Sequence, residues 1–114
     1  MTLNQPLPDD PLKFIQRCIS QGRILWTYHV NIRLKGRFIP RQAIIESYAS
    51  YEIIEQYPKD KYLPSYLVRS EFQGDIFHIL FAIDVEGDNA RIVTAYRPNS
   101  EEWEDGFRIR RHPS

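Results

Sequence analysis

The sequence predicts an α+β fold, with a small antiparallel sheet of about four strands covered on one face by helices. Three observations carry this prediction. Apolar residues recur at helical spacing before Tyr51 and alternate with a period of two after it. The later apolar segments are separated by "QGD" and "EGDN", which are typical of hairpin turns and so make neighbouring strands antiparallel. A chain of 114 residues, 42% of them hydrophobic, also suits one domain with its own core.

The first half of the chain is predicted to form helices around one short strand. Asp10 is a suitable N-cap and Gly22 a suitable stop for an amphipathic N-terminal helix, an addition to the rest of the fold. The segment "ILWTY" at 24–28 is aliphatic and aromatic, as expected of a strand. A second helix is expected from His29 to about Arg37, and Pro40 opens a third.

The second half is predicted to form the sheet. Four segments have the strand pattern: "YEIIEQY", "YLVRSEF", "IFHILFAIDV" and "RIVTAYR". The third is apolar on both faces apart from His78, so we expect it to lie centrally, between the second and the fourth. Helices from the 29–50 region are expected to cover one face. After Pro98, the segment "NSEEWEDGF" is expected to form a helical turn with Ser100 as its cap.

The domain organisation follows from these elements. Residues 1–9 are rich in proline and are predicted to be a mobile leader. Residues 10–111 are predicted to form a single α+β domain, and residues 112–114 a tail. We find no internal repeat and no linker that would divide the chain further.

The charge pattern is local rather than global. The chain carries 15 Lys or Arg and 15 Asp or Glu, so its net charge does not indicate a nucleic-acid-binding protein. Residues 22–45, however, contain five basic residues and no acidic one. Within them His29, Arg33 and Arg37 are spaced four residues apart, which stacks them along one side of a helix. This side is either an anion-binding surface or an ordinary solvated helix face.

Several classes of protein are disfavoured by what the sequence lacks. Three His and the single Cys18 do not have the spacing of metal ligands, and there is no Gly-rich phosphate-binding loop. We therefore expect no cofactor and no metal. The N-terminus lacks the pattern of a signal peptide, and no apolar segment is long enough to cross a bilayer. These features predict a cytoplasmic protein that does not engage a membrane.

His78 is the strongest candidate for chemistry outside the basic segment. It is a lone polar residue in an apolar strand, and the neighbouring strand ends with Tyr96 and Arg97. His and Tyr can exchange protons and Arg can hold a phosphate, which suits the cleavage of a phosphodiester. The alternative is a core histidine whose ring is satisfied by a backbone or tyrosine partner.

The ordered set of motifs resembles the bacterial family known as domain of unknown function 4258. The resemblance rests on "TYHVNIRLKGRFI", then "FHIL", then "IVTAYRPNSEEW" and a closing "RIRR", and it covers roughly residues 23–111. This family is similar to the BrnT and RelE-like toxins, compact α+β ribonucleases that act on messenger RNA, and its members often occur beside an antitoxin-like partner. The resemblance therefore implies a RelE/BrnT-like fold and a toxin–antitoxin function.

The resemblance also implies functional positions. The recurrent polar positions of the family fall on His29, Arg33, Arg37, His78 and Tyr96, with Trp103 and Arg111 as weaker matches. The chain departs from the family pattern in two places. Phe38 stands where relatives commonly have Gly, and Pro40 stands where they commonly have a Ser or Thr cap. Both substitutions change the turn beside the basic helix.

Together these features predict a metal-independent endoribonuclease in which a ribose 2′-hydroxyl attacks the adjacent phosphorus. His29 or His78 is expected to be the base, and the other histidine or Tyr96 the acid. The residues expected to bind phosphate or RNA are all arginines: Arg33, Arg37, Arg97 and Arg111. The expected partners are RNA and a cognate antitoxin protein. Two alternatives remain: a non-catalytic RNA- or antitoxin-binding module, and a purely structural or protein-interaction domain.

Overall fold

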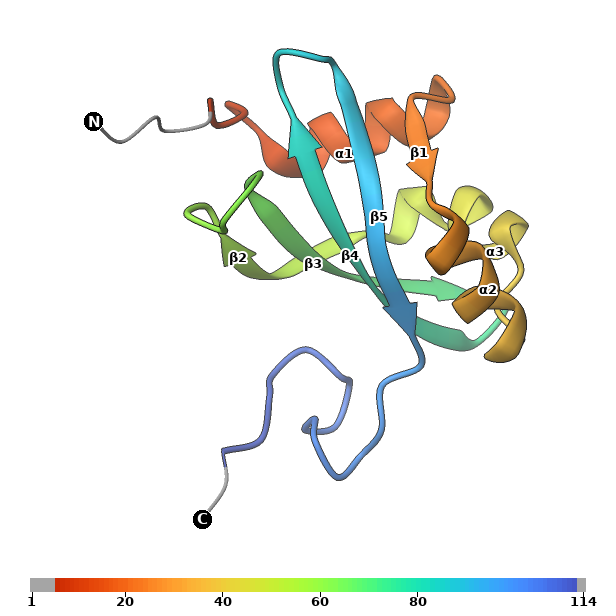
Figure 1. The fold of residues 1–114 in the computed structure, drawn as a ribbon. Coiled ribbons are helices and arrows are strands. Elements are labelled where there is room, and N and C mark those ends of the chain that lie inside the picture. The colour runs from red at the N-terminus through yellow and green to blue at the C-terminus, as the bar shows by residue number, and fades with distance from the viewer. Residues whose placement is uncertain (1–5, 113–114) are drawn as a thin grey trace.

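The computed structural model describes residues 6–112 and contains one five-stranded sheet with three α-helices (Figure 1). Residues 1–5 of the predicted leader and residues 113–114 of the predicted tail lie outside the described residues. Within the described part, no helix has the length and apolar character needed to span a membrane. The α+β prediction is confirmed at this level.

The first two helices each begin after a residue whose side chain caps the helix. Helix α1 (Pro11–Ser20) starts after Asp10, whose carboxylate accepts a hydrogen bond from the Lys13 N–H at 3.1 Å. Thr27 caps α2 (Tyr28–Gly36) in the same way, so this helix begins one residue before His29. Helix α3 (Arg41–Glu46) follows Pro40, and a short 3-10 turn, η1 (Tyr48–Ser50), leads into the sheet.

Phe38 occupies the left-handed backbone region between α2 and α3, with a φ of 56°. Glycine adopts this conformation without steric cost, whereas a side chain with a Cβ does not. Phe38 therefore stands at a conformationally demanding position. The Phe38 ring is exposed, so packing in the core does not offset the steric cost of this backbone conformation.

The sheet has the order β1-β5-β4-β3-β2. Its strands are β1 (Ile24–Trp26), β2 (Glu52–Tyr57), β3 (Ser65–Phe72), β4 (Asp75–Asp84) and β5 (Asn89–Tyr96). The strand that contains His78 lies between β3 and β5, as predicted, and the strands from β2 to β5 are antiparallel neighbours. The β3–β4 turn consists of Gln73 and Gly74, both with positive φ, as the hairpin prediction requires.

The expectation of about four antiparallel strands was wrong in one respect. Strand β1 pairs with β5 in parallel, with Ile24 beside Ala90 and Trp26 beside Ile92, so the sheet is mixed and has five strands. The residues of β1 had the composition of a strand, but a parallel pair of distant segments leaves no hairpin signal between them. Its place in the sheet could therefore not be inferred locally.

One face of the sheet is covered by the helices and holds the core. The core combines α1 residues such as Ile15 and Cys18 with alternate residues of the strands, including Val68, Ile79 and Phe81. All five side chains are at most 1% exposed. We call this side the covered face, and it accounts for the apolar alternation that predicted the strands.

Among residues 6–112, no helix lies on the other side of the sheet, and we call it the uncovered face. Residues 98–112, the C-terminal segment, cross one end of this face (Figure 1). The expected helical turn with Ser100 as cap is not present. Instead the Asn99 side-chain oxygen accepts hydrogen bonds from the N–H groups of Glu101 and Glu102, which closes a turn. The segment then doubles back, with Trp103 and Arg110 as bridge partners.

Candidate functional site

Most of the polar side chains of the sheet lie on the uncovered face. The strand register places the following residues on it: Glu52, Glu55, Tyr57, Ser65, Leu67, Arg69, His78, Leu80, Ala82, Arg91, Thr94 and Tyr96. A register shift between Ile53 and Glu55 matters here, because an uninterrupted strand would turn Glu52 and Glu55 to opposite faces. The irregularity brings both carboxylates to the same side.

His78 is completely buried at one end of this face, and both of its ring nitrogens are engaged. Nε2 lies 2.8 Å from the Phe107 carbonyl oxygen, which can only accept, so Nε2 carries the proton. Nδ1 is then an acceptor, and the Tyr96 hydroxyl donates to it over 3.3 Å. Burial lowers the pKa of His78 more than the Phe107 hydrogen bond raises it, so the ring is neutral near neutral pH.

Trp103 of the C-terminal segment closes this end of the face. Its ring packs edge-on against His78, with 4.4 Å between the ring centroids, and it is only 1% exposed. The Arg110 guanidinium lies over the indole, 4.4 Å from its ring centroid. His78 is thus enclosed by Trp103, Tyr96 and the Phe107 main chain, and it does not reach solvent.

A polar cluster lies beside this closed end. Arg110 donates two hydrogen bonds to Glu55, of 3.2 and 3.1 Å, and the Tyr57 hydroxyl donates to the same carboxylate. Tyr96 completes the cluster from β5. We call these four residues the Glu55 cluster.

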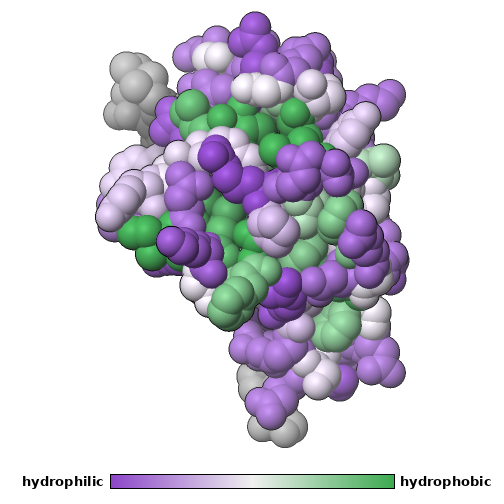
Figure 2. All heavy atoms as spheres, turned by 90° about the vertical axis from the view of Figure 1, so that its right-hand side faces the viewer, coloured by the Kyte–Doolittle hydropathy of each residue, from purple (hydrophilic) through white to green (hydrophobic). Residues whose placement is uncertain are grey.

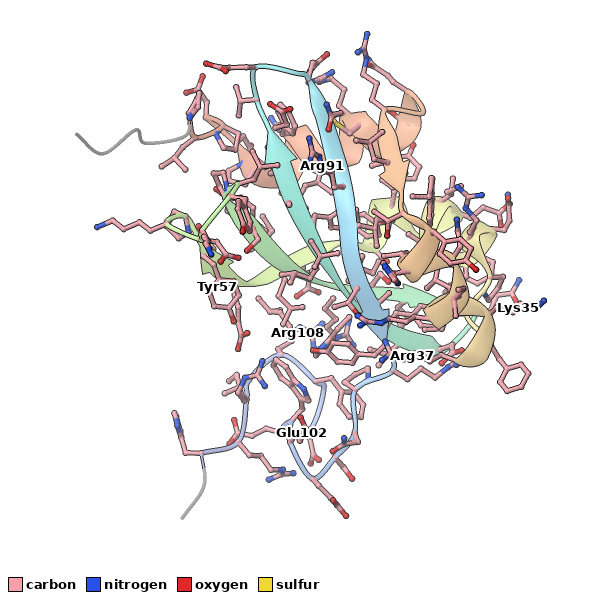
Figure 3. The ribbon with its side chains drawn as sticks, viewed as in Figure 1. Lys35, Arg37, Tyr57, Arg91, Glu102 and Arg108 are labelled. Carbon is pink, nitrogen blue, oxygen red and sulfur yellow. The ribbon has the colours of Figure 1, made fainter. Side chains whose placement is uncertain are left out.

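The Glu55 cluster surrounds a cavity of about 300 Å³, the Glu55 cavity. Its lining combines the cluster with residues from the middle of the sheet: Glu55, Tyr57, Asp60, Leu67, Leu80, Thr94, Tyr96 and Arg110. In Figure 3, Tyr57 lies at the outer strand of the sheet, and Arg108 lies between the sheet and the C-terminal segment. The cavity therefore opens beside the segment that carries Arg110.

The protonation states within the cluster are set by its own contacts. Burial raises the pKa of Glu55, but hydrogen bonds from Arg110 and Tyr57 outweigh burial and lower the pKa overall. Burial raises the pKa of Tyr57, and the neighbouring Glu55 raises it further. Burial likewise raises the pKa of Tyr96. At neutral pH the cluster thus holds a carboxylate, a guanidinium and two protonated phenols.

A second ion pair of the same type lies outside the cavity. Arg108 donates two hydrogen bonds to Glu52, of 2.8 and 2.9 Å, and Arg69 lies 4.0 Å from the same carboxylate. Glu52 and Glu55 therefore each join β2 to the C-terminal segment through an ion pair with an arginine. Only Glu55 lines the Glu55 cavity, which makes Glu52 a natural control for it.

Three of the four arginines predicted to bind phosphate or RNA donate hydrogen bonds to main-chain carbonyls. Arg37 donates to the Ala95 carbonyl at 2.6 Å, and Arg111 donates to the Ser100 and Trp103 carbonyls. Arg97 donates to the Arg37 and Phe38 carbonyls and also pairs with Asp75. Arg37 accordingly lies against the end of β5 in Figure 3, whereas Lys35 points away from the sheet. The fourth, Arg33, is exposed on α2.

His29 lines a different cavity, of about 430 Å³, which we call the His29 cavity. Its lining comes from the start of α2, the loop before β3 and the middle of the sheet: Thr27, His29, Asp60, Tyr62, Leu63, Ser65, Leu80, Ala82, Arg91, Ile92 and Val93. His78 lines neither cavity, so the structure does not bring the two histidines together. The two cavities adjoin, because Asp60 and Leu80 line both.

The basic segment at 22–45 does not form a uniformly charged surface. Tyr28, Ile32 and Phe38 are exposed between its basic residues. Figure 2, which views this side of the molecule, shows hydrophobic groups interspersed with hydrophilic ones. The cations of this segment are thus separated by apolar side chains.

Glu55, Tyr57 and Arg110 were not singled out from the sequence. The spacing of Glu55 and Tyr57 is a weak local signal, because residues two apart in a strand share a face. Arg110 joins Glu55 across 55 positions of the chain, and no local pattern predicts such a pair. Within residues 6–112, the structure gathers no group of three or more His, Cys, Asp or Glu side chains that could hold a metal ion.

The fold and the site thus define a mixed-sheet α+β domain with a polar cluster on its uncovered face. The chain belongs to the family described as domain of unknown function (DUF4258), whose model matches residues 26–97. No curated protein and no solved structure matches the chain. The matched region runs from β1 to the end of β5, so it includes Glu55, Tyr57 and Tyr96, whereas Arg110 and Trp103 follow it.

Proposed function

We propose that the chain is a metal-independent endoribonuclease with the Glu55 cavity as its active site. The observation that carries the proposal is the Glu55 cluster, in which a carboxylate, a guanidinium and two phenols face one cavity. A carboxylate can remove a proton, a protonated phenol can supply one, and a guanidinium can bind the oxygens of a phosphate. These are the three tasks of phosphodiester cleavage without a metal.

The reaction begins with attack of a ribose 2′-hydroxyl on the adjacent phosphorus. Glu55 accepts the proton of that hydroxyl as the new P–O bond forms. The bond from phosphorus to the 5′-oxygen of the next nucleotide breaks, and the Tyr96 hydroxyl turns from His78 Nδ1 to supply the proton that this oxygen needs. The products are a 2′,3′-cyclic phosphate and a free 5′-hydroxyl. Arg110 stabilises the charge on the non-bridging oxygens.

The Glu55–Arg110 pair couples substrate binding to activation of the base. Arg110 lowers the pKa of Glu55 in the free protein. A phosphate that engages Arg110 competes with Glu55 for the same N–H donors and weakens this hold. The pKa of Glu55 then rises, which makes it a stronger base when substrate is bound. Tyr57 keeps the carboxylate oriented through its own hydrogen bond.

His78 takes a positioning role in this proposal rather than that of a base. Its Nδ1 accepts from the Tyr96 hydroxyl, and its Nε2 proton is committed to the Phe107 carbonyl. The ring therefore fixes the position of Tyr96 at the edge of the cavity. His29, at the start of α2, is assigned to RNA binding because it lines the adjoining cavity, and Arg33, one turn further along the helix, is assigned to RNA binding with it.

The resemblance to the BrnT and RelE-like toxins supports a role in a toxin–antitoxin pair. We propose that the RNA is cleaved in the cytoplasm, that the chain is the toxin of a toxin–antitoxin pair, and that a cognate antitoxin protein is its partner.

One observation favours a second candidate function, a non-catalytic RNA- or antitoxin-binding module. The chain has no net charge, and its Arg110 cation is already paired with Glu55, so the field that draws RNA to a free enzyme is weak. In that case the same side chains position a bound partner without cleaving it. Cleavage itself distinguishes the two candidates.

The test uses single-stranded RNA of mixed sequence, purified full-length protein and excess EDTA. We expect cleavage that leaves cyclic phosphates and 5′-hydroxyl ends. Glu55→Gln should reduce the rate roughly a hundred- to ten-thousand-fold, as for loss of a general base. The matched control is Glu52→Gln, which removes the twin ion pair outside the cavity and should retain activity. Tyr96→Phe should give a milder loss.

Two outcomes would contradict the proposal. RNA binding by the wild-type protein without cleavage would favour the binding module. Equal losses in Glu55→Gln and Glu52→Gln would mean that the attachment of the C-terminal segment matters, rather than chemistry at Glu55. Circular dichroism on each variant ensures that only folded proteins are compared.

A further inference from the structure

The His29 cavity is the feature that the proposed reaction leaves unused. It is larger than the Glu55 cavity and adjoins it, because both are lined by Leu80 and Asp60. A ligand whose phosphate sits near Arg110 therefore has a second, adjacent space to fill. A nucleotide has two kinds of group that could fill two adjacent cavities, a phosphate and a base.

The composition of the His29 cavity suits a flat ring with polar edges. Leu63, Ala82 and Val93 supply an apolar surface that can pack against the face of such a ring. Tyr62 is 74% exposed at the same cavity, so its ring is available for stacking. Unpaired bases in single-stranded RNA are commonly bound by stacking on aromatic side chains.

Hydrogen-bond donors and acceptors are both present around this apolar surface. Arg91 supplies N–H donors, and its guanidinium lies 3.9 Å from Asp84 without a close hydrogen bond. His29 is exposed and can donate or accept. The Asp60 carboxylate accepts from the Ser65 hydroxyl at 2.6 Å and the Lys61 N–H at 2.9 Å. Each carboxylate oxygen has two lone pairs, so Asp60 can accept a further bond.

From this arrangement we infer that the His29 cavity binds the nucleobase of the nucleotide whose 2′-hydroxyl attacks in the Glu55 cavity. The inference rests on the proposed function and adds a substrate class to it, namely single-stranded RNA with an unpaired base 5′ to the cleaved phosphate. A base in a duplex has its pairing edge occupied and its faces stacked, so it cannot enter. The cavity thus selects single-stranded RNA over a duplex.

The test compares the affinities of the full-length protein for ligands with and without a base. The probes are the four nucleoside 3′-monophosphates, and ribose 3-phosphate is the base-free probe. Affinities are measured by NMR titration. We expect at least one nucleotide to bind about tenfold or more tightly than ribose 3-phosphate, a difference typical of one stacked base. Ala82→Phe, which fills the cavity surface, should remove this difference and leave ribose 3-phosphate binding intact.

The matched control is Ala49→Phe, an equal increase in size at an exposed position of η1 that lines neither cavity. It should bind every probe as the wild-type protein does. Equal affinity of the wild-type protein for nucleotides and ribose 3-phosphate would overturn the base site, even if RNA cleavage depends on Glu55. Loss of ribose 3-phosphate binding in Ala82→Phe would also overturn it, because the effect would then lie on the phosphate. Failure of the wild-type protein to bind any probe or cleave RNA would overturn both proposals.

Discussion

The two faces of the sheet are built by different forces. On the covered face, Ile79 and Phe81 are fully buried against the helices, and their contribution is apolar area removed from water. On the uncovered face, the neighbouring positions in the same strand are His78 and Leu80, and there a network of directional polar contacts replaces the helical layer. The comparison separates what holds the fold together from what is available to a ligand.

The difference also decides how each face responds to change. Apolar packing depends on volume and tolerates many partners, whereas a polar network depends on each donor meeting its acceptor. The covered face should therefore control stability, and the uncovered face should control binding and chemistry. The experiments below test this division.

The largest effect on stability is expected from a pair of neighbours on β4. Ile79→Ala should lower the free energy of unfolding by about 2–5 kcal/mol, because it leaves a cavity in a fully buried core. Leu80→Ala should cost less, since Leu80 is only partly buried, but it should weaken RNA binding because Leu80 lines both cavities. Chemical denaturation and RNA titration of both variants measure the contrast. Equal stability losses would mean that the faces do not differ as described.

His78→Gln tests whether a polar contact on the uncovered face also supports the fold. The amide cannot reproduce both ring hydrogen bonds beneath Trp103, and unmet buried polar groups typically cost about 1–3 kcal/mol. We expect a lower melting temperature, together with a smaller loss of cleavage per folded molecule than in Glu55→Gln. A variant as stable as the wild type but inactive would instead assign His78 to the chemistry.

Arg37 and Arg33 provide a smaller contrast on one helix. Arg37→Gln removes the hydrogen bond to the Ala95 carbonyl and should cost about 1 kcal/mol of stability. Arg33→Gln should change stability by less than about 0.5 kcal/mol, as is usual for an exposed residue. Arg33 lies one turn after His29, so its loss should reduce the salt dependence of RNA binding by about one counterion. An unchanged salt slope would mean that Arg33 is an ordinary solvated residue that does not contact a phosphate.

The smallest effect concerns pH. The folded-state pKa of Glu55 lies below its value in the unfolded chain, which is about 4.3, so the unfolded state takes up its proton first as the pH falls. The stabilising contribution of Glu55 is thus present at neutral pH and lost as the pH falls below about 4. Melting curves of the wild type and Glu55→Gln should differ near pH 7 and converge in acid. A gap that widens in acid would contradict the sign of the shift.

Much of the covered face could be predicted from the sequence. The apolar residues on both sides of His78 predicted that β4 is central, and Gln73 with Gly74 predicted the β3–β4 hairpin. Asp10 predicted the start of α1. Each of these signals is local, because burial and turn geometry impose a residue type on a single position or on a short period.

The uncovered face could be predicted only in part. Tyr96 was proposed from its place beside His78, and the two are indeed in contact. The register shift before Glu55, the fold of the C-terminal segment and the pairing of Glu55 with Arg110 have no local signature. Arg37 and Arg97 look like anion ligands in the sequence, but the structure shows their guanidinium groups on main-chain carbonyls. Whether an arginine is free depends on distant backbone that a single sequence does not reveal.

Both proposals require that RNA binds on the uncovered face of the sheet. An NMR titration tests this claim with a single-stranded oligoribonucleotide that is 2′-O-methylated throughout and therefore cannot be cleaved. We expect the largest backbone amide shifts at Leu80, Ala82 and Thr94, which line the two cavities. Shifts confined to α1 and α3, or no shifts at oligonucleotide concentrations that saturate binding in a parallel assay, would contradict the claim.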